Sequence, residues 1–172
     1  MSQLTIPAKK KQPEKTLSWG EVDWMLELAL SKMHDAKYLP EVLVPIGGGG
    51  IIPAAILAYR LYKRTGVAIN VMPPIYCKSY DHLSHEQGQL SMTWYDSLKS
   101  YDGFNTLFVD DICDTGRTLW AISERMPKSQ AFAIVTKVAG LPSWFSTYDG
   151  NNHWWNFPWE KVPAPKPKGE TK

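Results

Sequence analysis

LFVDDICDTGRTL, at residues 107–119, is the most informative segment of this chain. Its apolar first residues are typical of a buried strand, and two adjacent carboxylates, Asp110 and Asp111, follow directly. The residues DTGRT (114–118) then lead into a helix predicted over 118–126. A buried strand, an acidic loop and a helix in this order indicate an α/β protein, in which ligands bind beyond the carboxyl ends of the strands.

The loop Asp110–Thr118 has the residue types of a site for a phosphorylated sugar. Backbone N–H groups at a helix N-terminus, threonine hydroxyls and a glycine that permits close approach make a phosphate cradle. Adjacent carboxylates accept hydrogen bonds from a vicinal diol, or hold Mg²⁺ directly or through water. A ribose 5-phosphate carries both a phosphate and two hydroxyls. The alternative is acidic capping of a surface helix, which needs one aspartate where this loop has three.

Apolar strands alternate with amphipathic helices on both sides of this motif. Ser18 and Glu21 have the spacing of a capping box at the start of the first helix. The periodicity predicts helices over 19–36, 53–64 and 118–126, and strands over 41–46, 68–71, 75–78, 106–109 and 131–136. We therefore expect a mostly parallel twisted sheet with helices on both faces, plus a small hood or lid.

Composition narrows the class of protein. The 172 residues, 44% hydrophobic and 21% charged, are typical of one soluble globular domain. The net charge is +2, but residues 16–159 hold 11 basic and 14 acidic side chains, which argues against a nucleic-acid-binding face. Cys77 and Cys113 are too few for a disulfide framework or a cysteine-rich zinc site. With neither a signal peptide nor a membrane span expected, the sequence indicates a cytoplasmic protein.

Three further segments define the expected organisation. Four glycines, Gly47, Gly48, Gly49 and Gly50, let main-chain N–H groups approach an anion, although four glycines alone also fit a tight turn. Residues 79–100 form a long polar and aromatic connection of the kind that often closes over a site. We expect flexible tails at 1–15 (basic) and 163–172 (Pro/Lys-rich), and a folded domain over 16–162.

The motif at 107–119 resembles the signature of type I phosphoribosyltransferases, enzymes that use 5-phosphoribosyl-1-pyrophosphate (PRPP). Residues 44–54 (VPIGGGGIIPA) are similar to the pyrophosphate loop of that family, and 77–82 (CKSYDH) to the start of its flexible lid. Residues 136–140 (TKVAG) and 154–159 (WWNFPW) resemble the base-recognition elements of the bacterial xanthine–guanine members. The resemblance covers about residues 17–162, with base recognition over about 137–160.

The resemblance implies a role for each part of the site. Asp110 and Asp111 hold the ribose hydroxyls and help to bind Mg²⁺, with Mn²⁺ as a substitute, and Asp114 accepts or relays the N7 proton of the base. The implied 5-phosphate site is Thr115, Gly116, Arg117 and Thr118, the pyrophosphate site is Gly47–Gly50, and the lid residues are Ser79 and Tyr80. Base binding is implied for Lys137, Trp154 and Trp155, with Trp154 as the stacking side chain. Relatives usually carry Arg or Lys at Gly48 and an acid at Asn156.

The implied activity is transfer of the 5-phosphoribosyl group from PRPP to a 6-oxopurine, giving a nucleoside 5′-monophosphate and pyrophosphate. The implied partners are PRPP and a purine, in a homodimer or homotetramer, without a specific nucleic acid or a membrane. Two alternatives stay open: a non-catalytic sensor of PRPP or a nucleotide, and a metal-dependent phosphohydrolase. His82 and His85 lack the acid or cysteine partners of a zinc site.

Overall fold

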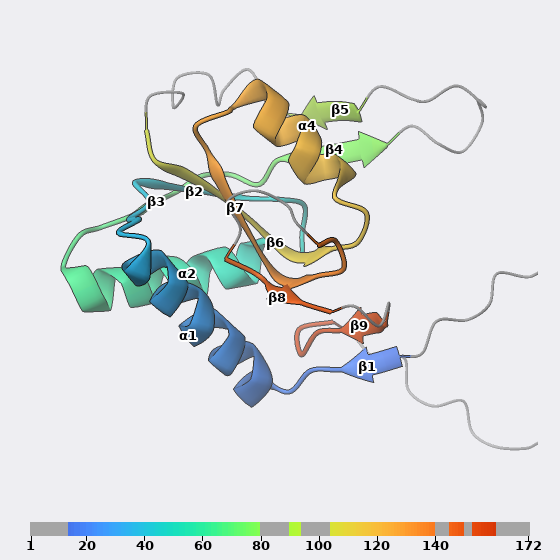
Figure 1. Ribbon diagram of the computed structural model, residues 1–172, viewed down its shortest axis with the longest axis horizontal. Helices are drawn as coiled ribbons and strands as arrows, with labels where there is room; N and C mark the ends of the chain where they lie inside the picture. The colour runs from blue at the N-terminus through green and yellow to red at the C-terminus, as the bar shows by residue number, and fades with distance from the viewer. Residues whose placement is uncertain (1–13, 80–89, 94–103, 140–144, 150–152, 161–172) are drawn as a thin grey trace, which may run out of the picture.

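A parallel sheet of five strands lies at the centre of the protein (Figure 1). The computed structural model describes residues 14–79, 90–93, 104–139, 145–149 and 153–160. In spatial order the strands are β3 (Asn70–Val71), β2 (Val42–Pro45), β6 (Thr106–Cys113), β7 (Gln130–Thr136) and β8 (Thr147–Tyr148). Every neighbouring pair is parallel, which confirms the type of sheet predicted from the sequence.

Helices cover both faces of this sheet, as predicted (Figure 1). The helices are α1 (Trp19–Asp35) and α2 (Ile51–Thr65) on one face and α4 (Arg117–Arg125) on the other. The predicted capping box starts α1: the backbone N–H of Glu21 donates to the Ser18 hydroxyl at 3.2 Å, and the backbone N–H of Ser18 donates to the Glu21 carboxylate at 2.8 Å. A left-handed glycine, Gly66 (φ +73°), ends α2, because glycine adopts this conformation without a steric penalty.

The core consists of two apolar layers, one on each side of the sheet. Side chains alternate along the strands, so that Leu107 and Val109 of β6 face α1 and α2, whereas Phe108 faces α4. Both layers are fully buried. The sheet is therefore a rigid base from which the carboxyl ends of β2, β6 and β7 present the loops that follow them.

The structure corrects two boundaries predicted from the sequence. First, β6 continues through Asp110 and Asp111 to Cys113, because its backbone stays paired with β7 as far as Cys113 and Thr136. Second, residues 14 and 15 are not part of a flexible tail. They belong to β1 (Glu14–Thr16), which pairs in parallel with β9 (Trp154–Asn156) near the other end of the chain.

The described part of the segment predicted as a lid belongs to a pair of strands. The strands β4 (Tyr76–Ser79) and β5 (Leu90–Thr93) pair antiparallel, and the sequence had not predicted the second of them. Tyr80, His82 and His85 lie outside the described residues, as do residues 1–13 and 163–172 of the predicted tails. In the described part of the chain, no helix has both the length and the apolar character needed to cross a membrane.

Candidate active site

The loop between β6 and α4 encloses a polar cavity. The cavity has a volume of about 140 Å³ and is lined by Asp110, Ile112 and the whole run from Cys113 to Leu119. Gly116 takes the N-cap position of α4 at φ +76°, and within the described segments no side chain makes an N-cap hydrogen bond to this helix. The first N–H groups of α4 are therefore left for a ligand at the positive end of the helix dipole. This cavity contains all four residues predicted to bind a 5-phosphate.

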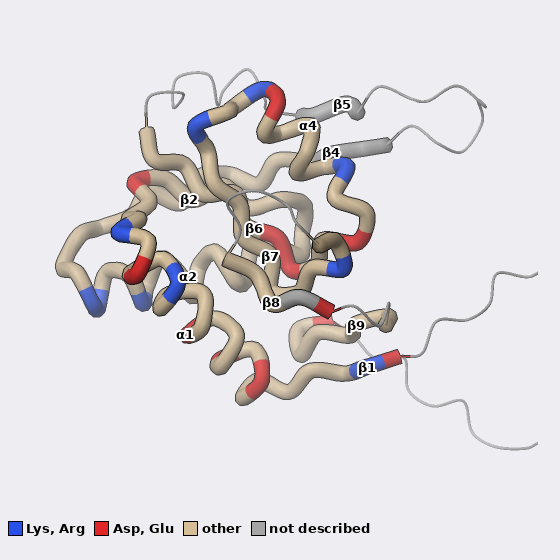
Figure 2. The backbone as a smooth tube through the Cα atoms, viewed as in Figure 1, with Lys and Arg blue, Asp and Glu red and all other residues tan. Residues whose placement is uncertain are grey.

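The acidic pair lies on β6 just before this cavity. The carboxyls of Asp110 and Asp111 are hydrogen-bonded to each other; Asp110 lines the cavity, whereas Asp111 lies against Gly49. The backbone N–H of Asp111 donates to Asp110 Oδ1 at 2.9 Å, and that of Ile112 donates to Asp111 Oδ1 at 2.7 Å. Figure 2 shows the pair as an acidic segment on β6 in the middle of the molecule.

Burial sets the electrostatics of these two carboxyls. It raises the pKa of Asp110 well above the usual range, and the adjacent charge of Asp111 adds to this effect. Burial also raises the pKa of Asp111, with a smaller contribution from the charge of Glu160, while the hydrogen bond from Ile112 opposes it. Both side chains would therefore gain from a cation or from hydroxyl donors beside them.

The glycine loop packs directly against the acidic pair. A Cβ atom on Gly49 would lie 2.2 Å from Asp111 Oδ2, and one on Gly50 would lie 2.1 Å from the carbonyl oxygen of Val109. Gly47 has φ +56°, and a Cβ atom on either Gly47 or Gly48 would meet no atom within 4 Å. Within the described part of the chain, the amides of Gly48 and Gly49 donate no hydrogen bond. These two amides are therefore free to meet an anion opposite Asp111.

Lys137 begins the loop after β7, and its side chain reaches Asp114, which lines the cavity. Its backbone N–H donates to the carbonyl of Cys113 at 2.9 Å, which fixes it beside the end of β6. Its side chain is only 5% exposed, and Nζ lies 2.8 Å from Asp114 Oδ1. This contact is an ion pair outside hydrogen-bond geometry, and no other oxygen of the described residues accepts from the ammonium. Because an ammonium carries three donors, a ligand oxygen could accept a hydrogen bond from it beside Asp114.

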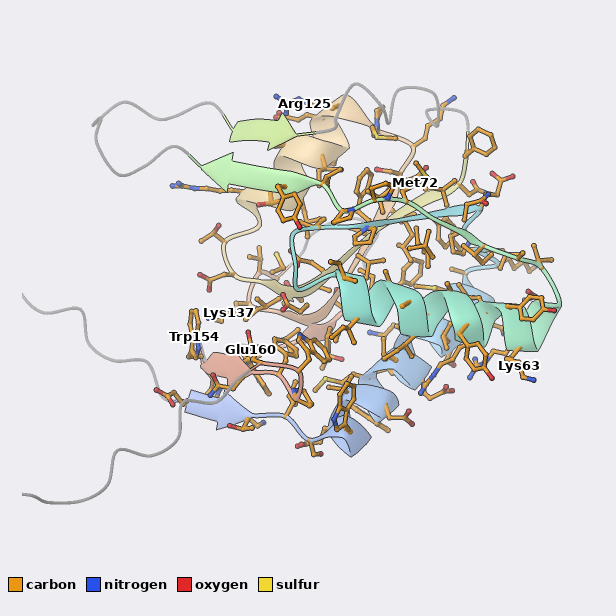
Figure 3. The ribbon with its side chains drawn as sticks, turned by 180° about the vertical axis from the view of Figure 1, so that it is seen from behind. Lys63, Met72, Arg125, Lys137, Trp154 and Glu160 are labelled. Atoms are coloured by element: carbon orange, nitrogen blue, oxygen red, sulfur yellow. The ribbon has the colours of Figure 1, made fainter. Side chains whose placement is uncertain are left out.

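The two tryptophans of β9 face opposite ways. Trp154 is 54% exposed, and its ring centroid lies 6.0 Å from Lys137 Nζ, whereas the side chain of Trp155 is 5% exposed and lies in the core. Figure 3 shows Lys137, Trp154 and Glu160 at the same end of the molecule. The structure therefore brings Trp154, Lys137 and Asp114 together. It puts the side chain of Trp155 on the other side of the strand.

Some of the predicted site residues lie outside the described part of the chain, and the sequence analysis missed two residues near the site. Ser79 ends β4, but its side chain and all of Tyr80 are not among the described positions. The sequence did not indicate Glu160, whose charge acts on Asp111, or Asp149, whose buried carboxylate accepts a hydrogen bond from the indole of Trp155. Asp149 is followed by Gly150, a pair that is typical of a turn, and so no signal marked it as buried.

Comparison with known proteins places the chain in a family. The model of the phosphoribosyl transferase domain matches residues 25–139, a span that includes the glycine loop, the acidic pair and Lys137. The chain belongs to the phosphoribosyltransferase family. The family predicted from the motif at 107–119 is thus confirmed, and with it the prediction of an enzyme.

Curated relatives of this phosphoribosyltransferase cover most of its length. It is 32% identical over 148 residues to the xanthine-guanine phosphoribosyltransferase of Desulfotalea psychrophila, covering 84% of each chain. It is 30% identical over 149 residues to the enzyme of the same name from Chromohalobacter salexigens, covering 84% of this chain and 83% of the relative.

Solved structures share the fold. The purine phosphoribosyltransferase of Pyrococcus horikoshii superposes with a TM-score of 0.63 at 23% identity, over 89% of this chain and 97% of the other. The xanthine-guanine-hypoxanthine phosphoribosyltransferase of Helicobacter pylori superposes with a TM-score of 0.65 at 20% identity, over 86% and 94%.

Proposed function

We propose that the protein transfers the 5-phosphoribosyl group of PRPP to a 6-oxopurine, namely guanine, xanthine or hypoxanthine, and releases pyrophosphate. One observation carries this proposal: Asp114, which lines the cavity at the N-terminus of α4, also forms an ion pair at 2.8 Å with the buried ammonium of Lys137. The cavity suits a phosphate and the ammonium suits a carbonyl oxygen. Relatives named for purine transfer support the same reaction.

The preference for a 6-oxopurine follows from the chemistry of Lys137. An ammonium has three donors and no acceptor, so it pairs with the O6 carbonyl of guanine, xanthine or hypoxanthine. Adenine would bring an amino group to the same place and leave two donors facing each other. Trp154 offers a half-exposed ring for stacking, and this interaction does not depend on which purine is bound.

The PRPP molecule would span the three loops at the carboxyl edge of the sheet. Its 5-phosphate occupies the cavity formed by Thr115, Gly116, Arg117 and Thr118. Its ribose hydroxyls meet the carboxylates of Asp110 and Asp111. Its pyrophosphate accepts hydrogen bonds from the loop Gly47–Gly50, where the amides of Gly48 and Gly49 are free of partners in the described chain.

The two carboxylates of the acidic pair can supply some, but not all, of the ligands that a magnesium ion needs. Asp110 and Asp111 are hard oxygen donors with raised pKa values, and a divalent cation beside them would favour their ionised forms. No group of three or more metal-ligating side chains occurs among the described residues, so PRPP oxygens and water would complete the shell. When bound, Mg²⁺ neutralises the charge of the departing pyrophosphate, and Mn²⁺ would substitute for it.

Asp114 has the position of a proton acceptor for the base. A nitrogen of the purine attacks C1 of the ribose, and the proton on N7 must leave as the new bond forms. The carboxylate of Asp114 is 56% exposed and borders both the phosphate cavity and Lys137. Once O6 of the purine takes the ammonium of Lys137, Asp114 is released from the ion pair to accept this proton.

Closure and assembly complete the proposal. Ser79 and Tyr80 would close over bound PRPP and exclude water, which otherwise hydrolyses it. The chain would form a homodimer or homotetramer, which is supported by exposed apolar side chains along α2: Ile51 (42%), Tyr59 (64%) and Tyr62 (50%).

A panel of bases tests the proposed function. Purified protein is incubated with PRPP, Mg²⁺ and guanine, xanthine, hypoxanthine, adenine, orotate or uracil, and the pyrophosphate formed is measured. We expect turnover with at least one 6-oxopurine and much less with the other three bases. Binding of PRPP without turnover would support a sensor instead, and phosphate release without any base would support a phosphohydrolase.

A further inference from the structure

Asp149 has no place in the reaction described above, yet it is a buried carboxylate next to the base site. We infer that Asp149 is a positioning residue for the purine: it holds Trp155, and through Trp155 it fixes the strand that presents Trp154. This inference rests on the proposed function, because Trp154 is the side chain expected to stack on the base.

The strand β9 needs such an anchor. It has three residues, and among the described residues it pairs with one strand, the three-residue β1. An isolated pair of short strands is marginally stable in water. Because side chains alternate along a strand, burial of Trp155 and exposure of Trp154 are coupled: whatever fixes the first indole also fixes the direction of the second.

Asp149 supplies the polar part of this anchor. The indole N–H of Trp155 donates to Asp149 Oδ2 at 2.7 Å, and His153 Nδ1 lies 3.2 Å from the same oxygen. The aspartate is 8% exposed and the tryptophan 5%. A hydrogen bond from a neutral donor to a buried carboxylate is stronger than one between neutral groups, so the geometry of the indole is well determined.

The backbone of Asp149 joins the same anchor to Lys137. Its N–H donates to the carbonyl oxygen of Thr136 at 2.8 Å, and Thr136 immediately precedes Lys137 in the chain. The side chain of Asp149 thus holds the strand that carries the stacking tryptophan, while its main chain holds the strand end that carries the proposed O6 donor. One residue sets the spacing between the two groups that would contact the purine.

The strand β1 holds Trp155 from another direction. Lys15 Nζ lies 4.6 Å from the centroid of the Trp155 ring, and the N–H of Leu17 donates to the carbonyl of Asn156 at 2.9 Å. A cation beside the face of an aromatic ring is attracted to it electrostatically. The N-terminal residues 14–17 therefore support the base site, although they lie far from it in the sequence.

The test compares three variants by the KM for the purine and for PRPP. Trp155→Phe keeps an aromatic ring in the core and removes the N–H that Asp149 binds. Asp149→Ala removes the acceptor, and Asp149→Asn keeps an oxygen for the indole. Trp24→Phe is the control, because it makes the same chemical change at a side chain that is 60% exposed on α1, outside the site.

We expect Trp155→Phe and Asp149→Ala each to raise the KM for the purine about tenfold. Loss of a hydrogen bond to a charged group changes an equilibrium constant by about 10- to 150-fold, and the expected rise lies at the lower end of this range. The KM for PRPP and kcat should stay within about twofold. The double variant should be no worse than Asp149→Ala alone, because that variant has already lost the hydrogen bond from Trp155. Asp149→Asn should lie between wild type and Asp149→Ala, and Trp24→Phe should match wild type.

The outcomes separate the two claims. A wild-type protein that uses no purine overturns the proposed function and this inference with it. An active wild type whose purine KM is unchanged by Trp155→Phe and Asp149→Asn overturns only the inference. The inference is also overturned if the KM for PRPP rises as much as the KM for the purine, because the substitutions would then disturb the whole active site and not the purine site alone. If Asp149→Ala fails to fold, Trp155→Phe and Asp149→Asn decide the matter.

Discussion

Replacing Gly49 with alanine tests the contact between the glycine loop and the acidic pair. A Cβ atom at this position would lie 2.2 Å from Asp111 Oδ2 and 2.5 Å from Oδ1, closer than the 3.0 Å below which real Cβ contacts essentially never fall. The loop or the carboxylate must therefore move. The neighbouring Gly48→Ala is a matched comparison, because its Cβ would meet no atom within 4 Å and its backbone needs no positive φ.

The size of the effect follows from the interaction that is broken. Asp111 accepts a 2.7 Å hydrogen bond from the N–H of Ile112, and a displaced carboxylate loses it. A hydrogen bond to a charged group contributes about 1.5–3 kcal/mol, which corresponds to about 10- to 150-fold in rate. We expect Gly49→Ala to lower kcat/KM for PRPP by this factor and Gly48→Ala to lower it at least tenfold less.

Pyrophosphate release at saturating purine measures both variants, and thermal melting shows whether each is folded. The reasoning is refuted if Gly49→Ala, folded like wild type, loses no more kcat/KM for PRPP than Gly48→Ala. It is also refuted if Gly49→Ala changes only the KM for the purine, since the affected contact lies on the side proposed for PRPP.

Four further results are expected. Asp114→Asn should lower kcat by about 10² to 10⁴, the usual contribution of a general base, and leave PRPP binding nearly intact; turnover within a few-fold of wild type would contradict the role of Asp114. Activity should disappear in EDTA and return with Mg²⁺ or Mn²⁺; full activity in chelator, or stoichiometric zinc in the purified protein, would exclude the proposed metal site. Lys137→Ala should narrow the selectivity for hypoxanthine over adenine by about 5- to 150-fold, from the 1–3 kcal/mol cost of an unsatisfied buried donor, and an unchanged ratio would count against O6 recognition. Asp110→Asn should stabilise the metal-free protein at pH 7 by about 0.5–2 kcal/mol. The reason is that burial raises the pKa of Asp110, so the folded state binds the proton more tightly than the unfolded state does. The wild type should therefore lose stability relative to the variant as the pH rises from about 4 through the pKa of Asp110 in the folded protein. Parallel unfolding curves for the two proteins across this range would show that burial does not destabilise the charged form.

Most of the central fold was predictable because its signals are local. The runs of apolar residues in β2, β6 and β7 and the helical period of α1 each follow from neighbouring residues, and the capping box at Ser18 fixes where a helix starts. Pairings between distant segments were not predictable in this way. Nothing near Glu14–Thr16 in the sequence indicates that this strand joins β9, 140 residues further along the chain.

The site shows the same division between local and distant information. The phosphate cavity is contiguous from Cys113 to Leu119, and so the motif predicts it almost residue by residue. Two contacts of the site join residues from separate loops: the ion pair between Lys137 and Asp114, and the close approach of Gly49 to Asp111. These loops come together only because the ends of three strands pack side by side. The buried role of Asp149 had no local signal, because its neighbours are typical of an exposed turn.

The products of a single reaction test the central claim most directly. Wild-type protein is incubated with PRPP, Mg²⁺ and hypoxanthine, and the nucleotide and the pyrophosphate are both quantified by mass spectrometry. Transfer at the site formed by Asp114, the 5-phosphate cavity and Lys137 predicts a nucleoside 5′-monophosphate and pyrophosphate in equal amounts, each matching the hypoxanthine consumed. Loss of PRPP without consumption of the base, or no reaction with any 6-oxopurine, would contradict it.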